Sequence, residues 1–183
     1  VPERMGNRHH TFTPHGIFPC SGENSWIAIA CESEEQWNAL CTVARQGWAE
    51  DARFKDNITR KTNEDAIEAA IGDWTASLER DALVAELASA GVIAAPVLSG
   101  TEVAADAGLR ERGIVRDVAH PETGKWAQAG NPMHFSRTPA DEVRPAPRLG
   151  EHSFEVLSEL LGMTEAEYEV LVASGVSGTE PTK

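Results

Sequence analysis

The chain has 183 residues, of which 41% are hydrophobic and 25% charged, so it can form the core of one ordinary domain. Its formal net charge of −13 argues against nucleic-acid binding, which needs a basic surface. No apolar run approaches the roughly 20 residues of a membrane span, and no charged start precedes an apolar segment. We therefore expect a cytoplasmic protein with no membrane or nucleic-acid partner.

The three cysteines, Cys20, Cys31 and Cys41, are odd in number and lack CxxC spacing. This pattern favours reduced thiols over a disulfide framework. We expect each to be a buried structural residue.

The first elements are predicted to be a pair of strands. "SWIAIAC" (25–31) has apolar residues on both faces, which is typical of a buried strand. "GIFPCSGEN" (16–24) places a Ser-Gly turn signal before it, as expected of a hairpin.

Three helices should follow this hairpin. Ser33 opens a capping box with Gln36, and Gly47 is the expected stop of the first helix. Thr62 or Asn63 would cap the second. The third is predicted from Arg80 to Ala90, ending at Gly91. The apolar faces of the first two comprise Trp37, Leu40, Cys41 and Ala44, and Ile67, Ala70, Ile71 and Trp74.

The next segments again mix strands and helices. Residues 92–99 form a strand candidate in which Pro96 indicates an edge or a strand end. Residues 101–112 predict one or two helical turns interrupted by Gly108. "IVRDVAHP" (114–121) has strand composition, and residues 124–137 resemble another hairpin. Because there is no strict βαβ rhythm, we predict an α+β fold, with a small mixed domain of a few strands and about four helices over 16–137.

Residues 138–183 differ in composition. A proline-rich connector precedes two predicted helices, the first stopping at Gly162 and the second starting with a capping box from Thr164 to Glu167. Their apolar positions are Leu157, Leu160 and Leu161, and Tyr168, Leu171 and Val172. Such a pair cannot bury its own apolar stripe, so we expect it to dock on a surface outside this chain.

The segment "GNRHHTFTPHG" (6–16) is a candidate for a metal site, a catalytic loop or a linker. Adjacent histidines point apart on a strand, and neither HExxH nor a cysteine pair completes a ligand set, so we predict no metal. GxSxG, P-loop and GxGxxG motifs are absent from the sequence, and the acidic runs are typical of solvated helix faces. The residues by themselves therefore indicate no active site.

An ordered set of motifs resembles the C-terminal half of class III CoA-transferases, the family of formyl-CoA transferase, carnitine CoA-transferase and alpha-methylacyl-CoA racemase. The similarity runs from about Arg4 to Leu171. The motifs are "GNRHHTFTPHGIFPCSGENSWIAIAC", "AGVIAAPVLSGTEVAADAGLRERGIV", "HPETG", "GNPMHFSRTP" and "RPAPRLGEHSFEVLSELLG".

The resemblance implies a small domain and a C-terminal return segment that belong with a Rossmann-like large domain, which carries the catalytic aspartate and has no counterpart in this sequence. We accordingly assign residues 1–15 to a crossing segment or active-site loop, 16–137 to the small domain, and 138–183 to the connector and C-terminal helices. The complete enzyme would be a homodimer.

The resemblance also bears on the site. It implies an acyl-CoA substrate, with the thioester as substrate and no metal or redox cofactor, and it transfers no catalytic residue to this chain. The segment 8–14 would form a wall of the acyl pocket, in which His9, His10 and Phe12 contact the substrate. Proline and β-branched residues make a flexible lid less favourable there.

Three hypotheses remain open. The chain is part of a CoA-transferase or an acyl-CoA racemase, inactive by itself without its catalytic domain. Alternatively, it is a non-catalytic binding or structural subunit, or a degenerate half, that supports a separate catalytic partner. A third hypothesis is that the isolated piece binds CoA; against it, we expect no binding tighter than about millimolar. Reading the coding frame upstream of Val1 separates the first two.

Overall fold

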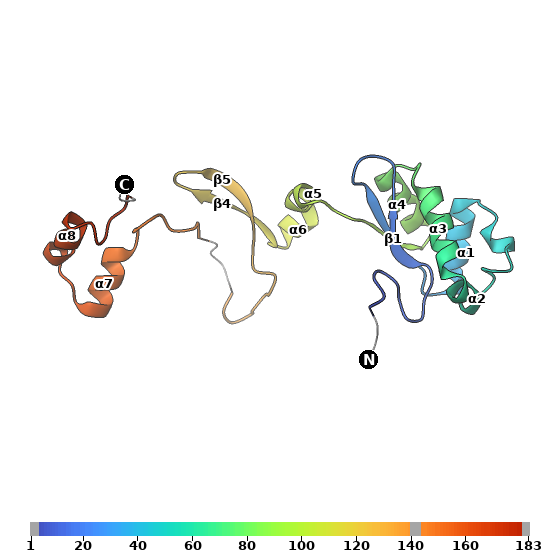
Figure 1. The fold of residues 1–183 in the computed structure, drawn as a ribbon, viewed down its shortest axis with the longest axis horizontal. Helices are drawn as coiled ribbons and strands as arrows, with labels where there is room; N and C mark the ends of the chain where they lie inside the picture. Colours follow the sequence, from blue (N-terminus) through green and yellow to red (C-terminus); the bar gives the residue numbers. More distant parts are fainter. Residues whose placement is uncertain (1–3, 140–143, 181–183) are drawn as a thin grey trace. The chain divides into compact units, whose positions relative to one another are not determined.

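The structure of this protein, a computed structural model, describes residues 4–139 and 144–180 (Figure 1). It contains two compact units, Val1–Ser99 and Gly100–Lys183. The described residues form eight α-helices, one short 3-10 helix and five strands in two small antiparallel sheets. The predicted α+β class is confirmed, while the predicted division at 15/16 and 137/138 stays a prediction.

Unit 1 is built on a three-stranded antiparallel sheet of β1 (His15–Pro19), β2 (Trp26–Ala30) and β3 (Ile93–Pro96) in the order β1-β2-β3. The predicted hairpin is therefore present. β3 lies at an edge and ends at Pro96, as the missing N–H of proline requires.

Helices cover one face of this sheet (Figure 1). They are α1 (Glu34–Ala44), α3 (Glu64–Thr75) and α4 (Arg80–Ser89), whose buried residues join the core. The 3-10 turn η1 (Trp48–Glu50) and α2 (Asn57–Thr62) lie between α1 and α3 in the sequence. Ser33 caps α1 as predicted, but the helix ends at Ala44 because Arg45 takes a left-handed conformation (φ 53°), not at Gly47.

Helix α2 was not anticipated from the sequence. Its six residues carry no apolar period, and a capping box between Asp56 and Thr59 starts it. Asn63 begins α3 without a side-chain capping bond.

The core of unit 1 lies between the sheet and the helices. Strand residues Phe18, Ile27 and Ile29 point into it, and Trp37 and Leu40 of α1 are at most 1% exposed. Cys20 and Cys31 are buried and Cys41 is half-buried, all as free thiols. Burial is thus confirmed for two of the three cysteines and only partial for Cys41.

Unit 2 begins with α5 (Gly100–Ala105) and α6 (Ala107–Glu111), followed by the antiparallel hairpin of β4 (Val115–His120) and β5 (Gly124–Ala129). The helical break falls at Asp106, not at Gly108, because the Asp106 carboxylate caps α6 by accepting from the Leu109 N–H. Within 124–137, β5 pairs backward with β4 and not with a later strand.

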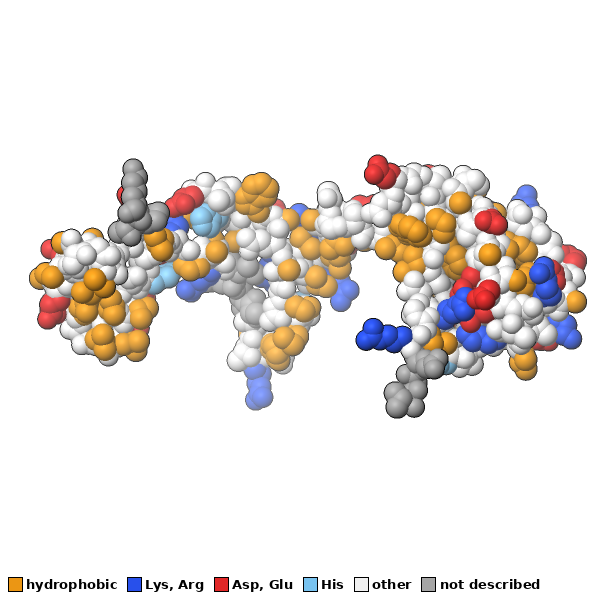
Figure 2. Space-filling model, in the orientation of Figure 1, with side chains coloured by type: hydrophobic (Ala, Val, Ile, Leu, Met, Phe, Trp, Pro, Cys, Tyr) orange, Lys and Arg blue, Asp and Glu red, His pale blue; other side chains and the backbone are white. Residues whose placement is uncertain are grey.

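The last elements are α7 (Ser153–Leu161) and α8 (Glu165–Ala173). Gly162 ends α7 at φ 67°, and the Thr164–Glu167 capping box starts α8, as predicted. Four apolar side chains of these helices and the following turn are at least 66% exposed: Leu160, Leu161, Val170 and Val176. Figure 2 shows hydrophobic side chains on the surface of this pair. Part of the predicted connector, residues 140–143, lies outside the described residues.

Residues 16–137 hold six short or medium helices where about four were predicted, because α2 was missed and one interrupted helix is two. In the part of the chain that the structure describes, no helix has the length and apolar character of a membrane span.

Candidate functional site

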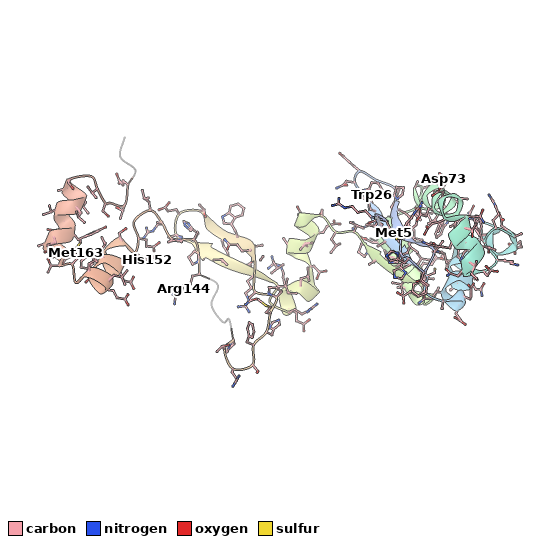
Figure 3. The ribbon with its side chains drawn as sticks, turned by 60° about the horizontal axis from the view of Figure 1, so that its bottom comes forward. Met5, Trp26, Asp73, Arg144, His152 and Met163 are labelled. Carbon is pink, nitrogen blue, oxygen red and sulfur yellow. The ribbon has the colours of Figure 1, made fainter. Side chains whose placement is uncertain are left out.

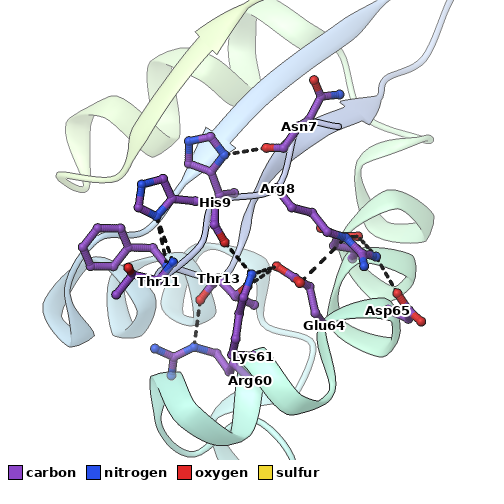
Figure 4. Close-up of polar contacts among 12 residues, drawn as sticks. Asn7, Arg8, His9, Thr11, Thr13, Arg60, Lys61, Glu64 and Asp65 are labelled. Atoms are coloured by element: carbon purple, nitrogen blue, oxygen red, sulfur yellow. Dashed lines mark hydrogen bonds and ion pairs between the residues drawn. The ribbon is translucent and has the colours of Figure 1, made fainter. Parts of the chain in front are cut away.

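The loop before β1 brings the rings of His10 and Phe12 beside that of His9. Figure 4 shows His9 and the polar contacts of this loop. The rings of His9 and Phe12 are stacked, with centroids 4.9 Å apart and planes at 15°. The His10 ring lies edge-on to the His9 ring at 6.4 Å, and the His15 ring is tilted against the His9 ring at 5.5 Å. His9 is therefore the centre of an aromatic cluster, in which His10 is exposed and Phe12 half-buried.

Hydrogen bonds fix the tautomers of His9 and His15. His9 Nδ1 accepts from the backbone N–H groups of Thr11 (3.2 Å) and Phe12 (3.3 Å), so its proton is carried by Nε2. His15 Nδ1 lies 2.6 Å from the carbonyl oxygen of Asn7, to which it donates. Nε2 of His9 is thus a donor that the loop itself does not use.

Two side chains of α2 hold the loop backbone. Asn57 accepts from the Thr13 N–H (3.2 Å) through Oδ1 and donates to the Thr11 carbonyl (2.7 Å) through Nδ2. Lys61 Nζ donates to the His9 carbonyl at 2.5 Å and to Glu64 at 2.7 Å. The loop is pinned at three points along its length.

Arg60 fixes the same segment from beneath. It is 1% exposed and donates to the carbonyls of Thr13 (3.1 Å) and Phe54 (3.1 Å). Its two terminal nitrogens pair with Glu34 of α1 at 2.9 and 3.0 Å, and its guanidinium lies 4.6 Å over the Trp37 ring. Because each nitrogen of this buried guanidinium has a hydrogen-bond partner, Arg60 is a rigid support for the loop.

Arg8 ties the loop to α3. Its Nη2 lies 2.5 Å from both Asp65 and Glu68, its Nε donates to Glu68 at 3.0 Å, and Glu64 is 3.8 Å away. The hydrogen bonds to Glu68 and Asp65 raise the pKa of Arg8. Glu64 is only 9% exposed and also accepts from the Thr13 hydroxyl at 2.5 Å.

The prediction that the acidic residues of α3 form a solvated helix face is therefore wrong for Glu64 and Glu68. They stand four residues apart, so one face of α3 directs both carboxylates at the same guanidinium. Only Asp65, with a side chain 89% exposed, is largely solvated.

A groove of about 470 Å³ runs over the face of the sheet opposite the core. Its origin is the alternation of strand residues: the isoleucines of "WIAIA" point into the core, while Ala28 and Ala30 point outward. Ile17 is paired with Ala28 on one side and Ile93 with Ala30 on the other, so large edge residues flank a low central floor. Figure 3 labels Trp26, at the start of β2, and Met5, ahead of β1.

The predicted site residues lie beside this groove and not in its lining. His15 lines it together with Gly6, Asn7 and Arg8, and the His9 ring adjoins it through His15. His10 and Phe12 adjoin the His9 ring and are not among the residues that line the groove.

Neither a metal centre nor an activated thiol is present among the described residues. Among residues 4–139 and 144–180, no group of three or more His, Cys, Asp or Glu side chains is arranged to hold a metal ion. Burial raises the pKa of the Cys31 thiol to about 12 and that of Cys41 to about 11, so neither is an activated nucleophile.

Sequence reasoning missed the supports of the loop: Asn57, Arg60, Lys61 and the Arg8 ion pairs. Each joins residues more than 40 positions apart, so no local pattern reports them. One local signal was present: Glu64 and Glu68 stand four residues apart on a predicted helix, and Lys61 precedes Glu64 by three residues.

A sequence model of CoA-transferase family III matches residues 1–153. A probable CoA-transferase of Mycobacterium tuberculosis is 32% identical over 166 residues, covering 90% of this chain and 21% of that protein. A formyl-CoA:oxalate CoA-transferase of Rhodopseudomonas palustris is 30% identical, covering 94% of this chain and 41% of the relative.

Solved structures agree with these matches. A CAIB/BAIF family protein from Brucella suis superposes with a TM-score of 0.75 and 31% identity, over 87% of this chain and 40% of that one. The chain thus spans about two fifths or less of the length of the proteins it matches.

Proposed function

This chain belongs to CoA-transferase family III, and from that premise we propose that it supplies the small domain and C-terminal helices of an acyl-CoA:carboxylate CoA-transferase. In such a reaction the CoA thiol leaves one acyl group and joins another, while a carboxylate oxygen passes to the released acid. The observation that carries the proposal is the family match over residues 1–153, together with a fold shared at a TM-score of 0.75.

We assign the chemistry of CoA transfer to a large domain outside this chain, with two complete subunits forming a homodimer. The relatives' greater length supports a further domain. The exposed apolar residues of α7 and α8 support a docking role for that helix pair, since solvent is a poor environment for Leu160 and Leu161.

Within the complete enzyme, we assign the loop 8–14 to the wall of the acyl pocket, with His9, His10 and Phe12 as substrate contacts. The pinned backbone supports a fixed wall and not a moving lid, because Lys61 holds the His9 carbonyl and Asn57 holds the backbone of Thr11 and Thr13. The Nε2–H of His9 is suited to donate to a carbonyl or carboxylate oxygen.

The thioester is the substrate in this scheme, and neither a metal nor a redox cofactor takes part. We place the enzyme in the cytoplasm, which is supported by the three free thiols Cys20, Cys31 and Cys41.

A racemase is the nearest alternative within the family, and a non-catalytic supporting subunit is the alternative outside it. The second is favoured by one observation: the carboxylates beside the histidine loop, Glu64, Asp65 and Glu68, all face Arg8, so none of these three is placed as a nucleophile. Continuous Rossmann-like coding sequence upstream of Val1 would support the enzyme, and a start codon nearby would support the subunit.

The direct test uses the full-length gene product, incubated with formyl-CoA and oxalate, with butyryl-CoA and acetate, and with a chiral 2-methylacyl-CoA. We expect transfer of CoA to the acceptor acid in at least one pair. Exchange of the α-proton without transfer would identify a racemase, and inactivity with every substrate would favour the subunit.

Isolated, the chain should bind CoA no tighter than about millimolar. Arg8 faces three carboxylates and Lys61 pairs with Glu64, so these two cations of the loop have little capacity for nucleotide phosphates. A micromolar constant in a calorimetric titration would contradict this assignment.

A further inference from the structure

We propose that the groove over β2 binds the hydrocarbon part of the acyl group, and that this part of the substrate carries no charge of its own. The inference rests on the proposed function, since it names the substrate class of that site. It concerns the part of the substrate beyond the reacting carbonyl.

The shape of the groove fits a narrow hydrocarbon chain. Ala28 and Ala30 form the floor, and Ala95 continues it across the β2–β3 pairing. Ile17 and Ile93, 40% and 46% exposed, stand at the edges. Since these large side chains point outward beside small ones, the sheet has a channel along its central strand.

The electrostatics of the groove exclude a second carboxylate. Arg8 is the only lysine or arginine among the described residues that line it, and its guanidinium is held by Glu68 and Asp65 with Glu64 nearby. Together with Lys61, these groups amount to two cations against three carboxylates. A carboxylate in the groove would find no unshared positive charge and would lose its hydration.

The size of the groove favours a small molecule over a protein segment. Its volume of about 470 Å³ lies within the range of roughly 300–1,000 Å³ that is typical of ligand pockets. His15, which pairs with Ala30 at one end of β2, lines the groove, and the His9 ring adjoins His15. An acyl chain in the groove would therefore have its thioester end at the histidine cluster.

The test measures kcat/KM of the full-length enzyme for acetyl-, butyryl-, hexanoyl-, malonyl- and succinyl-CoA with one acceptor. We expect about a fourfold rise for each methylene from acetyl to butyryl. We also expect a preference of about a hundredfold for butyryl-CoA over succinyl-CoA. No transfer from any thioester would overturn the proposed function as well, whereas a preference for succinyl- or malonyl-CoA overturns only this inference.

Two variants with opposite effects locate the acyl chain. Ala95→Leu fills the groove and should lower kcat/KM for hexanoyl-CoA about tenfold while sparing acetyl-CoA. Ile93→Ala widens it and should shift the optimum to a longer chain. Ala85→Leu, on the exposed surface of α4, is the matched control and should change neither.

Unchanged chain-length selectivity in both groove variants would overturn the inference. A loss of dimerisation or of stability in both groove variants would also overturn the inference, because the groove would then be covered by protein and not by substrate. Failure of Ala95→Leu to fold leaves Ile93→Ala to decide between these outcomes.

Discussion

Arg60 and Glu34 form a two-point ion pair that joins α2 to α1, with nitrogen–oxygen distances of 2.9 and 3.0 Å. The arginine is buried while the glutamate side chain is 48% exposed. Through its bond to the Thr13 carbonyl, the same arginine supports the histidine loop. The pair therefore couples the stability of unit 1 to the geometry of the candidate site.

Removal of Arg60 should be among the most destabilising substitutions in unit 1. Arg60→Ala leaves the carbonyls of Thr13 and Phe54 without this donor and opens a space over Trp37, at a cost of about 3 kcal/mol in the free energy of unfolding. Glu34→Ala should cost less, about 1–2 kcal/mol, because water reaches the glutamate side. Urea unfolding of the chain measures both, and an equal or reversed order would contradict the account.

Asn57 should control the order of the loop more than the stability of the fold. In Asn57→Ala the Thr13 N–H and the Thr11 carbonyl lose their partner, so the Thr13 amide should exchange with solvent about tenfold faster. Hydrogen exchange followed by NMR gives the rate. Asn38→Ala, on the exposed surface of α1, is the control; similar exchange in both variants would show that the loop is held by other contacts.

We expect the thiols of Cys31 and Cys41 to cause a loss of stability at alkaline pH. Their pKa values are raised above the ordinary 9.0, to about 12 for Cys31 and about 11 for Cys41, mainly by burial. Below pH 9 both folded and unfolded chains keep these protons, so this contribution is constant. Between about pH 9 and 12 the unfolded chain releases them first, and the free energy of unfolding falls as pH rises.

The contribution of Cys31 is isolated by comparing wild type with Cys31→Ala at pH 8 and pH 10.5. The wild type should lose more stability over this interval, by up to about 1 kcal/mol per pH unit, although the variant starts less stable. Parallel pH profiles would show that the thiol is not protected by burial.

The helix pair α7–α8 should matter for assembly and little for folding of this chain. Leu160 and Leu161 are 74% and 70% exposed, so Leu160→Glu should change the free energy of unfolding of residues 1–183 by no more than about 0.5 kcal/mol. In the full-length protein the same substitution should destabilise or dissociate the enzyme, because a charge would enter an apolar interface. Scanning calorimetry and ultracentrifugation compare the two; equal effects in both would refute docking.

The sequence could predict elements whose signals are local. Ser33 and the Thr164–Glu167 box mark helix starts, and Gly162 marks a stop, because each acts through hydrogen bonds or a backbone angle within one turn. Local patterns do not predict α2, because its six residues have no apolar face. They also do not predict the break at Asp106, because the helix that this residue caps is only five residues long.

The site was less accessible to prediction. The family resemblance points to His9, His10 and Phe12, and the contacts of the His9 ring with the other two rings are local in sequence. The groove depends on Ala28 pairing with both Ile17 and Ala95, which lie on different strands, so only the register creates its shape. The Arg8–Glu68 bond spans 60 residues for the same reason.

The most direct measurement of the central claim is steady-state kinetics of the full-length enzyme with His9→Ala and His10→Ala. If the loop is a wall of the acyl pocket, KM for the acyl-CoA should rise about tenfold in His9→Ala, with kcat within about threefold of wild type and a smaller effect in His10→Ala. Unchanged KM and kcat in both variants would place the substrate elsewhere. Complete loss of turnover in a folded His9→Ala enzyme would contradict the account by making His9 a catalytic residue.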